Sequence, residues 1–300
     1  MHAEQEQKKG FYFALAAYGM WGVFPIYFHA IASVPAMEVL AHRIAWSLAF
    51  LAAILLISKR GKDILELLKK PKLLLSLTLT AIIVSANWMI FIWAVAQEQI
   101  LEAALGYYIN PLVSVFLGMI FLGERLRRGQ WLAILLALAA VSYQLILLGK
   151  LPWIALSLAF SFGLYGLLRK TIPVDSILGL FTETLLLFPF AIGYMVWLAS
   201  HNELVLLNAS AGLSLLLLAA GIVTSLPLLC FTSATQRLSL LYIGLMQYIA
   251  PSISFLIAIF YFGETLDSNR LITFIMIWLA LVIFTAEGLI RRRQNKRSAV

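Results

Sequence analysis

The sequence has little charge and almost no cysteine. Only 12% of its 300 residues are charged, while 62% are hydrophobic; an average soluble domain has roughly 25% charged residues. This composition excludes an ordinary soluble protein and indicates a membrane protein. The one cysteine, Cys230, cannot form an internal disulfide, and inside an apolar stretch it is expected to be a small buried side chain.

Long apolar runs supply the membrane-spanning segments. A bilayer core about 30 Å thick requires roughly 20 apolar residues in one helix, and these runs lack the alternation that membrane β-strands show. We therefore predict an all-α integral membrane protein with ten transmembrane helices. Their expected ranges are 11–30, 37–57, 73–95, 103–122, 130–148, 152–169, 177–198, 211–232, 240–262 and 270–290.

Basic residues are distributed unevenly among the connections, and Lys and Arg favour the cytoplasmic side of a membrane. With a cytoplasmic N-terminus, 19 of the 22 basic residues fall in cytoplasmic segments, Arg169 and Lys170 among them. Lys150 and Arg270 lie on the opposite side, and Arg43 lies inside a span.

This asymmetry predicts that both termini are cytoplasmic. Residues 1–10 then form a cytoplasmic N-terminus, and residues 291–300 form a basic cytoplasmic tail. The net charge of +8 follows from the same asymmetry, so no nucleic-acid partner is expected. The tail is better suited to anionic lipid headgroups.

The chain contains an internal repeat. Segments 106–126 and 246–266 superpose without a gap at a shift of 140 residues, and a similar shift brings Trp21-Gly22 near Phe162-Gly163. We predict a first five-helix repeat at 11–148 and a second at 149–290. The matched residues are Tyr108 and Tyr248, Ile109 and Ile249, Pro111 and Pro251, Ser114 and Ser254, and Gly123-Glu124 and Gly263-Glu264.

Five helices are an odd number, so the second repeat should cross the membrane in the opposite sense. Loop charge agrees with this inversion, because the 59–72 connection carries six basic residues while its counterpart, 200–210, carries none. Two inverted units can rock against each other and open a central site to either side alternately. The sequence has no obvious selectivity filter or ring of like charges that would favour a channel.

Seven motifs follow one another along nearly the whole chain. They are WG-x-x-P-x-Y at 21–27, E-x-x-x-HR-x-x-W at 38–46, NW-x-x-F-x-WAV at 87–95, LGYYINPL at 105–112, GERL at 123–126, G-x-VT-x-x-PLLCF at 221–231 and QYI-x-P at 247–251. In this order and spacing they resemble the RarD subgroup of the EamA-type drug/metabolite transporter superfamily.

The resemblance implies ten helices in two inverted EamA units and a location in a bacterial inner membrane. The name of the subgroup is tied to chloramphenicol sensitivity, but the resemblance supplies no physiological substrate. His29, Tyr108 and Ser114 stand where relatives often have lysine, phenylalanine and asparagine, and these departures bear on specificity more than on fold.

Three ionisable residues stand in the outer half of the second span. Glu38 and His42 share a helix face, whereas Arg43 is turned by about 100° from His42 around the helix axis. Arg43 should lie roughly 6 Å outward of the span centre, where a charge costs about 2.5–3.5 kcal/mol. We expect Arg43 to bind an anionic or polar substrate group or to form half of a buried pair; outward snorkelling is the alternative.

Proton coupling has three candidate residues. Glu183 occupies the position in the second half that matches Arg43, and the axial gap between the two should be roughly 12 Å. A buried carboxylate can exchange a proton, as can His42 near neutral pH, while Glu38 is the third candidate. A structural hydrogen bond remains open for Glu183 and His42, and a favourable helix-dipole contact remains open for Glu38.

Pro111 and Pro251 should kink their helices, because each proline removes a backbone donor and frees a carbonyl. The side chains beside these kinks either line a substrate site or pack against neighbouring helices. Asn87 and Trp88 should face the bundle interior. The expected substrate-binding residues are Arg43, Trp21, Asn87, Trp88, Tyr107, Tyr108, Asn110, Gln247 and Tyr248.

The sequence thus favours a secondary transporter that exports or exchanges a small amphiphilic metabolite or drug-like compound. Its expected partners are the lipid bilayer, this solute and, as an open hypothesis, protons; no cofactor and no metal are expected. The alternative is a membrane-embedded enzyme acting on a lipid-linked substrate, with Glu38 and His42 as acid and base. Glu124 and Glu264, each beside a glycine at a helix end, are expected to cap helices or pair within loops.

Overall fold

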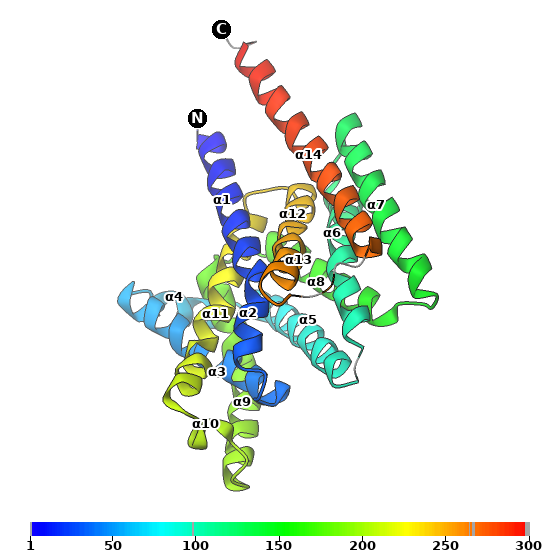
Figure 1. The fold of residues 1–300 in the computed structure, drawn as a ribbon. Helices are drawn as coiled ribbons and strands as arrows, with labels where there is room; N and C mark the ends of the chain where they lie inside the picture. The colour runs from blue at the N-terminus through cyan, green and yellow to red at the C-terminus, as the bar shows by residue number, and fades with distance from the viewer. Residues whose placement is uncertain (1, 98, 264, 266–267, 298–300) are drawn as a thin grey trace.

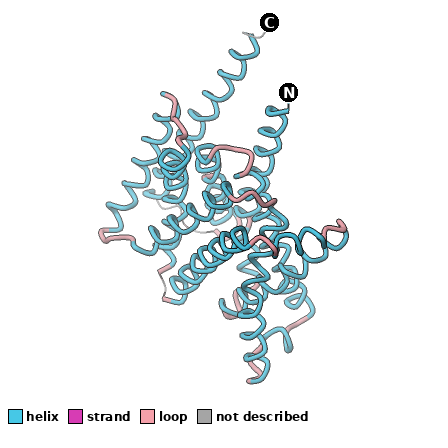
Figure 2. The backbone as a smooth tube through the Cα atoms, turned by 180° about the vertical axis from the view of Figure 1, so that it is seen from behind, coloured by secondary structure: helices cyan, strands magenta, loops and turns pink. Residues whose placement is uncertain are grey.

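The computed structural model is helical throughout the part of the chain that it describes, residues 2–97, 99–263, 265 and 268–297 (Figures 1 and 2). Short connections join the helices, and no strand occurs in these residues. The helices are α1 (His2–Gly22), α2 (Phe24–Ala30), α3 (Ala36–Ile57), α4 (Gly61–Leu68), α5 (Pro71–Ala96), α6 (Ile100–Leu122), α7 (Arg128–Leu148), α8 (Trp153–Thr171), α9 (Ser176–Ser200), α10 (Val205–Asn208), α11 (Ala211–Thr235), α12 (Leu240–Gln247), α13 (Ile249–Phe260) and α14 (Ser268–Arg297).

Nine helical segments within the described residues are long and apolar enough to cross a membrane. Two of them join a pair of helices, α1 with α2 and α12 with α13. The remaining long helix, α8, is not among the nine, and its last turn carries Arg169 and Lys170, which lower its mean hydropathy. The expected all-α integral membrane fold is confirmed, and the tenth span stays a prediction.

Two of the expected spans are interrupted. The first divides between α1 and α2, and Pro25 stands in the first turn of α2, where a proline costs the helix no hydrogen bond. The span expected at 240–262 divides at Tyr248. Pro251 cannot donate to the carbonyl of Gln247, and its ring crowds that carbonyl, so a break directly after Gln247 has a local cause.

Helices distant in sequence pack against one another in the bundle. α3 contacts α9 and α11, α6 contacts α8 and α12, α1 contacts α11 and α13, and α5 contacts α8 and α9. α7 and α14 lie side by side (Figure 1). Glycines permit the closest approaches: a Cβ added to Gly221 would lie 2.2 Å from the carbonyl carbon of Trp46, and one added to Gly244 would lie 2.6 Å from the carbonyl oxygen of Pro111. Small residues have this role in membrane bundles.

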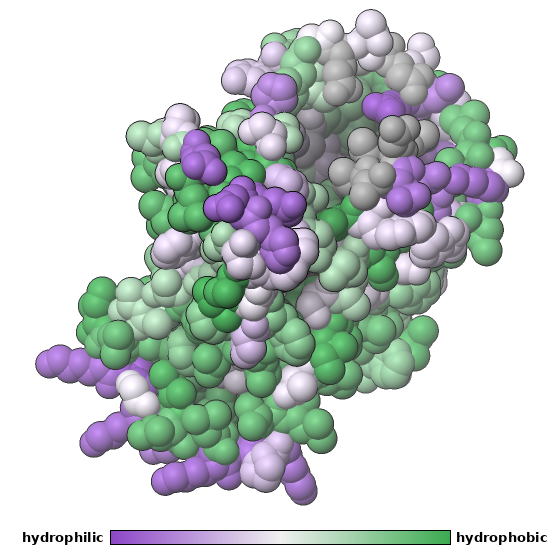
Figure 3. Space-filling view, turned by 90° about the horizontal axis from the view of Figure 1, so that it is seen from below, coloured by the Kyte–Doolittle hydropathy of each residue, from purple (hydrophilic) through white to green (hydrophobic). Residues whose placement is uncertain are grey.

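Apolar side chains cover the outside of the bundle as well as filling it. Ile57, Ile146, Phe190 and Phe260 each expose more than three quarters of their surface, which is unfavourable in water and expected in lipid. Figure 3 shows a broad apolar area with polar side chains gathered toward its edges. The start of α1 and the end of α14 lie toward the same end of the molecule (Figure 1).

The ends of the chain and the first long connection contain more helix than the sequence indicates. α1 already begins at His2, within the segment expected at 1–10, and the α14 backbone continues to Arg297, within the tail expected at 291–300. Residues 298–300 of that tail lie outside the described residues. The 59–72 connection, treated above as a loop, contains α4.

Candidate functional site

Arg43 is held at a junction of four helices. Its Nε donates a 2.9 Å hydrogen bond to Thr224 Oγ1 on α11. Its guanidinium carbon lies 4.9 Å from the ring centre of Trp88 on α5 and 5.8 Å from that of Phe28 on α2. Both distances are within the range of cation–π attraction. The cation is therefore stabilised by aromatic faces and a hydroxyl, with no carboxylate among these contacts.

Tyr107 brings α6 to the same region. Its hydroxyl is close enough to Arg43 to interact with it electrostatically, and its ring centre lies 6.3 Å from that of Phe91. Tyr107 nevertheless exposes 53% of its surface, while Arg43 and Trp88 are partly exposed. Of the expected substrate-binding residues, these three combine a shared location with accessible surface.

Asn87 and Trp21 have defined structural contacts. The side-chain amide of Asn87 donates to the carbonyl oxygen of Leu158 at 2.9 Å and to Ser161 Oγ at 2.8 Å, which ties α5 to α8. The ring of Trp21 lies among aromatic neighbours, with centre-to-centre distances of 5.7 Å to Phe162 and 5.6 Å to Phe231.

Glu183 lies in a second polar junction, where it is only 1% exposed. Its Oε1 accepts a 2.6 Å hydrogen bond from Thr80 on α5, and its Oε2 accepts a 3.1 Å hydrogen bond from Tyr165 on α8. Arg169 Nε lies 3.6 Å from Oε1. The carboxylate therefore has a buried cationic partner, and that partner is Arg169.

The surroundings of Arg169 differ from those that the count of basic residues assumed. The count placed this residue in a cytoplasmic connection, but the structure buries it completely. Gly179 on α9 makes room for it, because a Cβ there would lie 2.3 Å from the guanidinium nitrogens. Arg169 and Glu183 lie on either side of the short turn between α8 and α9, and their side chains meet beside Gly179. The short separation of the two residues in the sequence could have indicated this pair, but the charge count treated every arginine at a helix end as solvated.

Glu38 and His42 form a separate cluster. Both are fully buried, and His42 Nε2 lies 3.5 Å from Glu38 Oε1. The same carboxylate oxygen accepts a 2.9 Å hydrogen bond from the backbone N–H of Val205. Trp46 donates to His42 Nδ1 at 3.1 Å. In this arrangement the pair joins α3 to the segment that precedes α11.

The residues just before Pro251 pack against α6 near Pro111, where α6 contacts α12. α6 runs without interruption through Pro111, and the hydroxyl of Tyr248 donates to the carbonyl oxygen of Tyr108 at 3.1 Å. Ser114 donates to Gln247 Oε1 at 3.5 Å. Tyr248 and Gln247 are buried, and so is Asn110, whose Oδ1 has no hydrogen-bond partner. The structure places this group between the helices of the two halves.

Two carboxylates cap helices across the chain. Glu124 accepts hydrogen bonds from the backbone N–H groups of Leu240 and Leu241, at 2.8 and 2.9 Å, at the start of α12. Glu102 accepts from the N–H of Ile154 at the start of α8. Glu264 lies outside the described residues.

An ion-pair cluster that the sequence analysis missed joins α4 to the start of α9. The two guanidinium Nη atoms of Arg60 donate to the two Oδ atoms of Asp175, at 3.2 and 2.7 Å, and Arg60 Nε donates to Asp63 at 2.6 Å. Asp175 also caps α9 by accepting from the N–H groups of Ile177 and Leu178.

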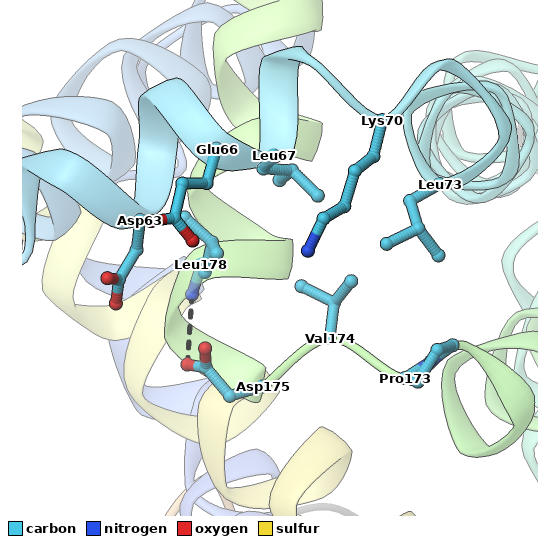
Figure 4. Close-up of a pocket in the computed structure, with 9 residues that line it drawn as sticks. All are labelled: Asp63, Glu66, Leu67, Lys70, Leu73, Pro173, Val174, Asp175 and Leu178. Carbon is cyan, nitrogen blue, oxygen red and sulfur yellow. Dashed lines mark hydrogen bonds between the residues drawn. The ribbon is translucent and has the colours of Figure 1, made fainter.

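The cluster borders a pocket of about 180 Å³ that is lined by Asp63, Glu66, Leu67, Lys70, Leu73, Pro173, Val174, Asp175 and Leu178 (Figure 4). Burial alone would raise the pKa of Asp175. The hydrogen bonds from Arg60 and from the α9 backbone outweigh burial and hold that pKa below its ordinary value. The same contact with Asp175, followed by that with Asp63, raises the pKa of Arg60.

The chain is similar in sequence to bacterial proteins and in fold to a solved structure. The model of the EamA-like transporter family matches residues 8–145. An "uncharacterized transporter" of Vibrio cholerae is 48% identical over 95% of this chain and 95% of its own length. "Protein RarD" of Salmonella typhimurium is 47% identical over 97% of this chain and 99% of its own length. A crystal structure with 18% identity aligns with a TM-score of 0.67 over 91% of this chain and 96% of that chain, which indicates a shared fold.

Proposed function

The chain belongs to the EamA-like transporter family, in its RarD subgroup, and from this premise we propose that it is a secondary transporter. It exports or exchanges a small amphiphilic metabolite or drug-like compound by alternating access. Ten membrane-spanning helices form two inverted five-helix repeats, and both termini lie in the cytoplasm of a bacterial cell. The substrate passes through a central path between the repeats.

The pattern of helix contacts supports the inverted repeat. The first half contributes α1–α2, α3, α5, α6 and α7, and the second half contributes α8, α9, α11, α12–α13 and α14. Exchanging each helix with its counterpart converts the α1·α13 contact into α8·α6, α3·α11 into α9·α5, and α1·α11 into α8·α5. The contacts α3·α9, α6·α12 and α7·α14 pair counterparts directly. A two-fold axis that relates the two halves would produce these contacts, because it maps each of them onto another of them or onto itself.

A pair of glycine contacts supports the same relation at the level of residues. A Cβ on Gly22 would lie 2.6 Å from the Cβ of Ile253, and a Cβ on Gly163 would lie 2.8 Å from Cγ1 of Val113. Gly22 and Gly163 are 141 positions apart, and Val113 and Ile253 are 140 apart. Each half thus uses a glycine on its first helix to admit a branched side chain of the other half.

The observation that carries the proposal is a pair of matched polar junctions. Arg43 bonds to Thr224 and lies over Phe28, while Glu183 bonds to Thr80 and pairs with Arg169. Arg43 and Glu183 are 140 positions apart and Phe28 and Arg169 are 141 apart, as in the repeat. Thr80 and Thr224 are 144 apart, which is about one helical turn beyond that shift.

Membrane-depth charges are costly and mark transport pathways. Two such charges at equivalent places in inverted halves therefore favour a path through the bundle over a purely structural role.

The Arg43 junction is our proposed substrate site. An arginine over aromatic faces can bind a carboxylate or another polar group and still pack against an apolar scaffold. Trp88 and Tyr107 lie beside it with accessible surface. Trp21, Asn87, Tyr108, Asn110, Gln247 and Tyr248 are assigned to the surrounding packing that shapes the path.

The Glu183 junction is our proposed site of proton coupling. Protonation of Glu183 would remove the negative charge beside Arg169 and leave the arginine uncompensated, so the contact between α8 and α9 would weaken. Glu38 and His42 are the second candidates for this role. They are less favoured because Glu38 already accepts a hydrogen bond from the backbone N–H of Val205 and lies beside a histidine rather than an arginine. Their burial disfavours the alternative of an enzyme that uses them as acid and base.

A ligand screen followed by a flux assay tests the proposal. Purified protein is screened for solutes that raise its thermal stability, and each such solute is then measured for counterflow in proteoliposomes. Arg43→Ala should abolish counterflow, and Arg43→Lys should weaken apparent affinity by at least about tenfold, because lysine lacks the planar fork and its stacking. Arg128→Ala, at an exposed position on α7, should leave transport unchanged.

Two outcomes contradict the proposal. A solute that is chemically converted without vectorial movement would identify an enzyme. Undiminished counterflow by a folded Arg43→Ala protein would remove Arg43 from the substrate site.

A further inference from the structure

The short helix α4 has no role in the transport proposal. It begins after Arg60, directly beyond the end of α3, and it lies at the left edge of the bundle in Figure 1. Extended hydrophilic side chains also stand out on the left side of the face shown in Figure 3. Its position makes α4 a candidate for contact with the surroundings of the protein.

One side of α4 is fixed against the second half of the chain. Leu67 is 4% exposed and packs with Val174 and Leu178, and Ile64 lies against the same cluster. The ion pairs of Arg60 with Asp63 and Asp175, described above, hold the start of the helix. The rotation of α4 about its axis is therefore set, and so is the face that it turns outward.

The outward face is apolar and adjoins lysines. Leu65 and Leu68 expose 61% and 48% of their surface. At 100° per residue the apolar arc runs from Leu67 through Ile64 and Leu68 to Leu65, and Lys69 and Lys62 follow directly on the exposed side. Because this arc is wider than the face that the protein covers, Leu65 and Leu68 remain largely exposed.

The charges around α4 are mostly positive. Arg60 is neutralised by Asp63 and Asp175, and Glu66 is the remaining acidic residue of the helix. The other basic residues of the 59–72 connection are exposed: Lys59, Lys62, Lys69, Lys70 and Lys72.

We propose that α4 lies in the membrane–water interface, with Leu65 and Leu68 at the boundary of the acyl chains and Lys62 and Lys69 bound to phosphates of anionic lipid headgroups. Amphipathic helices with leucines on one face and lysines beside them bind membranes in this way. Lipid fits better than a soluble protein partner because α4 directly follows a membrane span whose last residues, Leu56 and Ile57, are 73% and 82% exposed. The apolar surface of α4 continues the surface that α3 presents to the bilayer.

Site-specific labelling tests the depth of α4. In a Cys230→Ser background, the full chain carries either Leu65→Cys or Glu66→Cys, each labelled with an environment-sensitive fluorophore and reconstituted in phosphatidylcholine vesicles with phosphatidylglycerol. The label at position 65 should be quenched by spin-labelled lipid and protected from iodide, and the label at position 66 should be quenched by iodide. Equal iodide quenching at both positions would overturn the proposal and leave the face free for a soluble partner.

Charge replacement tests the headgroup contact. Each lysine near an anionic surface contributes about 1 kcal/mol, or roughly fivefold in affinity. Replacing both Lys62 and Lys69 by glutamine should therefore weaken retention of phosphatidylglycerol by roughly 30-fold, whereas replacing both by arginine should preserve it. Unchanged retention by the glutamine variant would overturn the assignment of these two lysines, with the arginine variant as the control for folding.

Discussion

Removing one partner of the buried Arg169–Glu183 pair should destabilise the protein more than removing both. Arg169 and Glu183 are 0% and 1% exposed, and Nε lies 3.6 Å from Oε1. At an effective dielectric constant of about 20, two unit charges at this distance attract by roughly 4–5 kcal/mol. Glu183→Gln leaves an uncompensated buried guanidinium, so we expect a loss of about 3–5 kcal/mol in the free energy of unfolding.

A variant that removes both charges separates their effect on stability from their role in transport. Replacing Arg169 by methionine and Glu183 by glutamine removes both charges at nearly constant volume, and most of the lost stability should return. Any dependence of transport on a proton gradient should not return, because the titratable carboxylate is absent. Stability is measured by equilibrium unfolding in mixed micelles, and coupling is measured by flux with and without a pH gradient.

A surface pair serves as the matched control. Arg237 Nε and Glu6 Oε2 lie 2.9 Å apart, with side chains 30% and 33% exposed. Replacing these two in the same way should change stability by less than about 1 kcal/mol in each variant. A double variant of Arg169 and Glu183 that is as unstable as the sum of its single variants would refute the argument. Retained proton dependence in that double variant would refute the role of Glu183 in coupling.

Three further predictions concern the start of α9 and the packing of α3. Asp175→Asn should lower the free energy of unfolding by less than about 1 kcal/mol, because the ion pair with Arg60 is partly exposed and asparagine still caps the helix. Asp175→Ala also removes the cap, so it should lower the free energy of unfolding by about a further 0.5–2 kcal/mol in the same unfolding assay. The pKa of Asp175 is lower in the folded state than in the unfolded state, so the stability that its carboxylate contributes is fully present above the unfolded pKa and is lost as the pH falls through the folded pKa. The difference in unfolding free energy between wild type and Asp175→Asn should therefore vanish in acid. A difference that grows on acidification would contradict this. Gly221→Ala should destabilise by about 1–3 kcal/mol or more, because its Cβ would meet the Trp46 backbone at 2.2 Å, whereas Gly19→Ala, with nothing within 4 Å of the added Cβ, should be neutral or stabilising.

The helical architecture could be predicted because bilayer thickness fixes the length of an apolar run. The ranges expected at 37–57, 103–122 and 130–148 differ from α3, α6 and α7 by only a few residues at each end. The division at Tyr248 was not predicted, since a proline can kink a helix or end it, and the surroundings decide which occurs. α4 was not predicted because eight residues are too few for a periodic pattern to stand out among lysines.

The candidate site was only partly readable from the sequence. Arg43 and Trp88 were both expected in the interior, and the structure brings them together. The partner of Glu183 was missed because Arg169 follows an apolar run, where a basic residue is usually solvated. Its burial depends on the space beside Gly179, which is a property of helix packing that no single segment encodes.

The accessibility of Tyr107 tests the central claim of alternating access most directly, and it requires no knowledge of the substrate. Cys230 is the single cysteine of the chain, so a Cys230→Ser, Tyr107→Cys protein carries one thiol at a position that is 53% exposed and beside Arg43. In oriented proteoliposomes we expect a membrane-impermeant thiol reagent to react with this cysteine from either side of the membrane. Reaction from one side only, or only with a lipid-soluble reagent, would contradict a path that opens alternately to both sides.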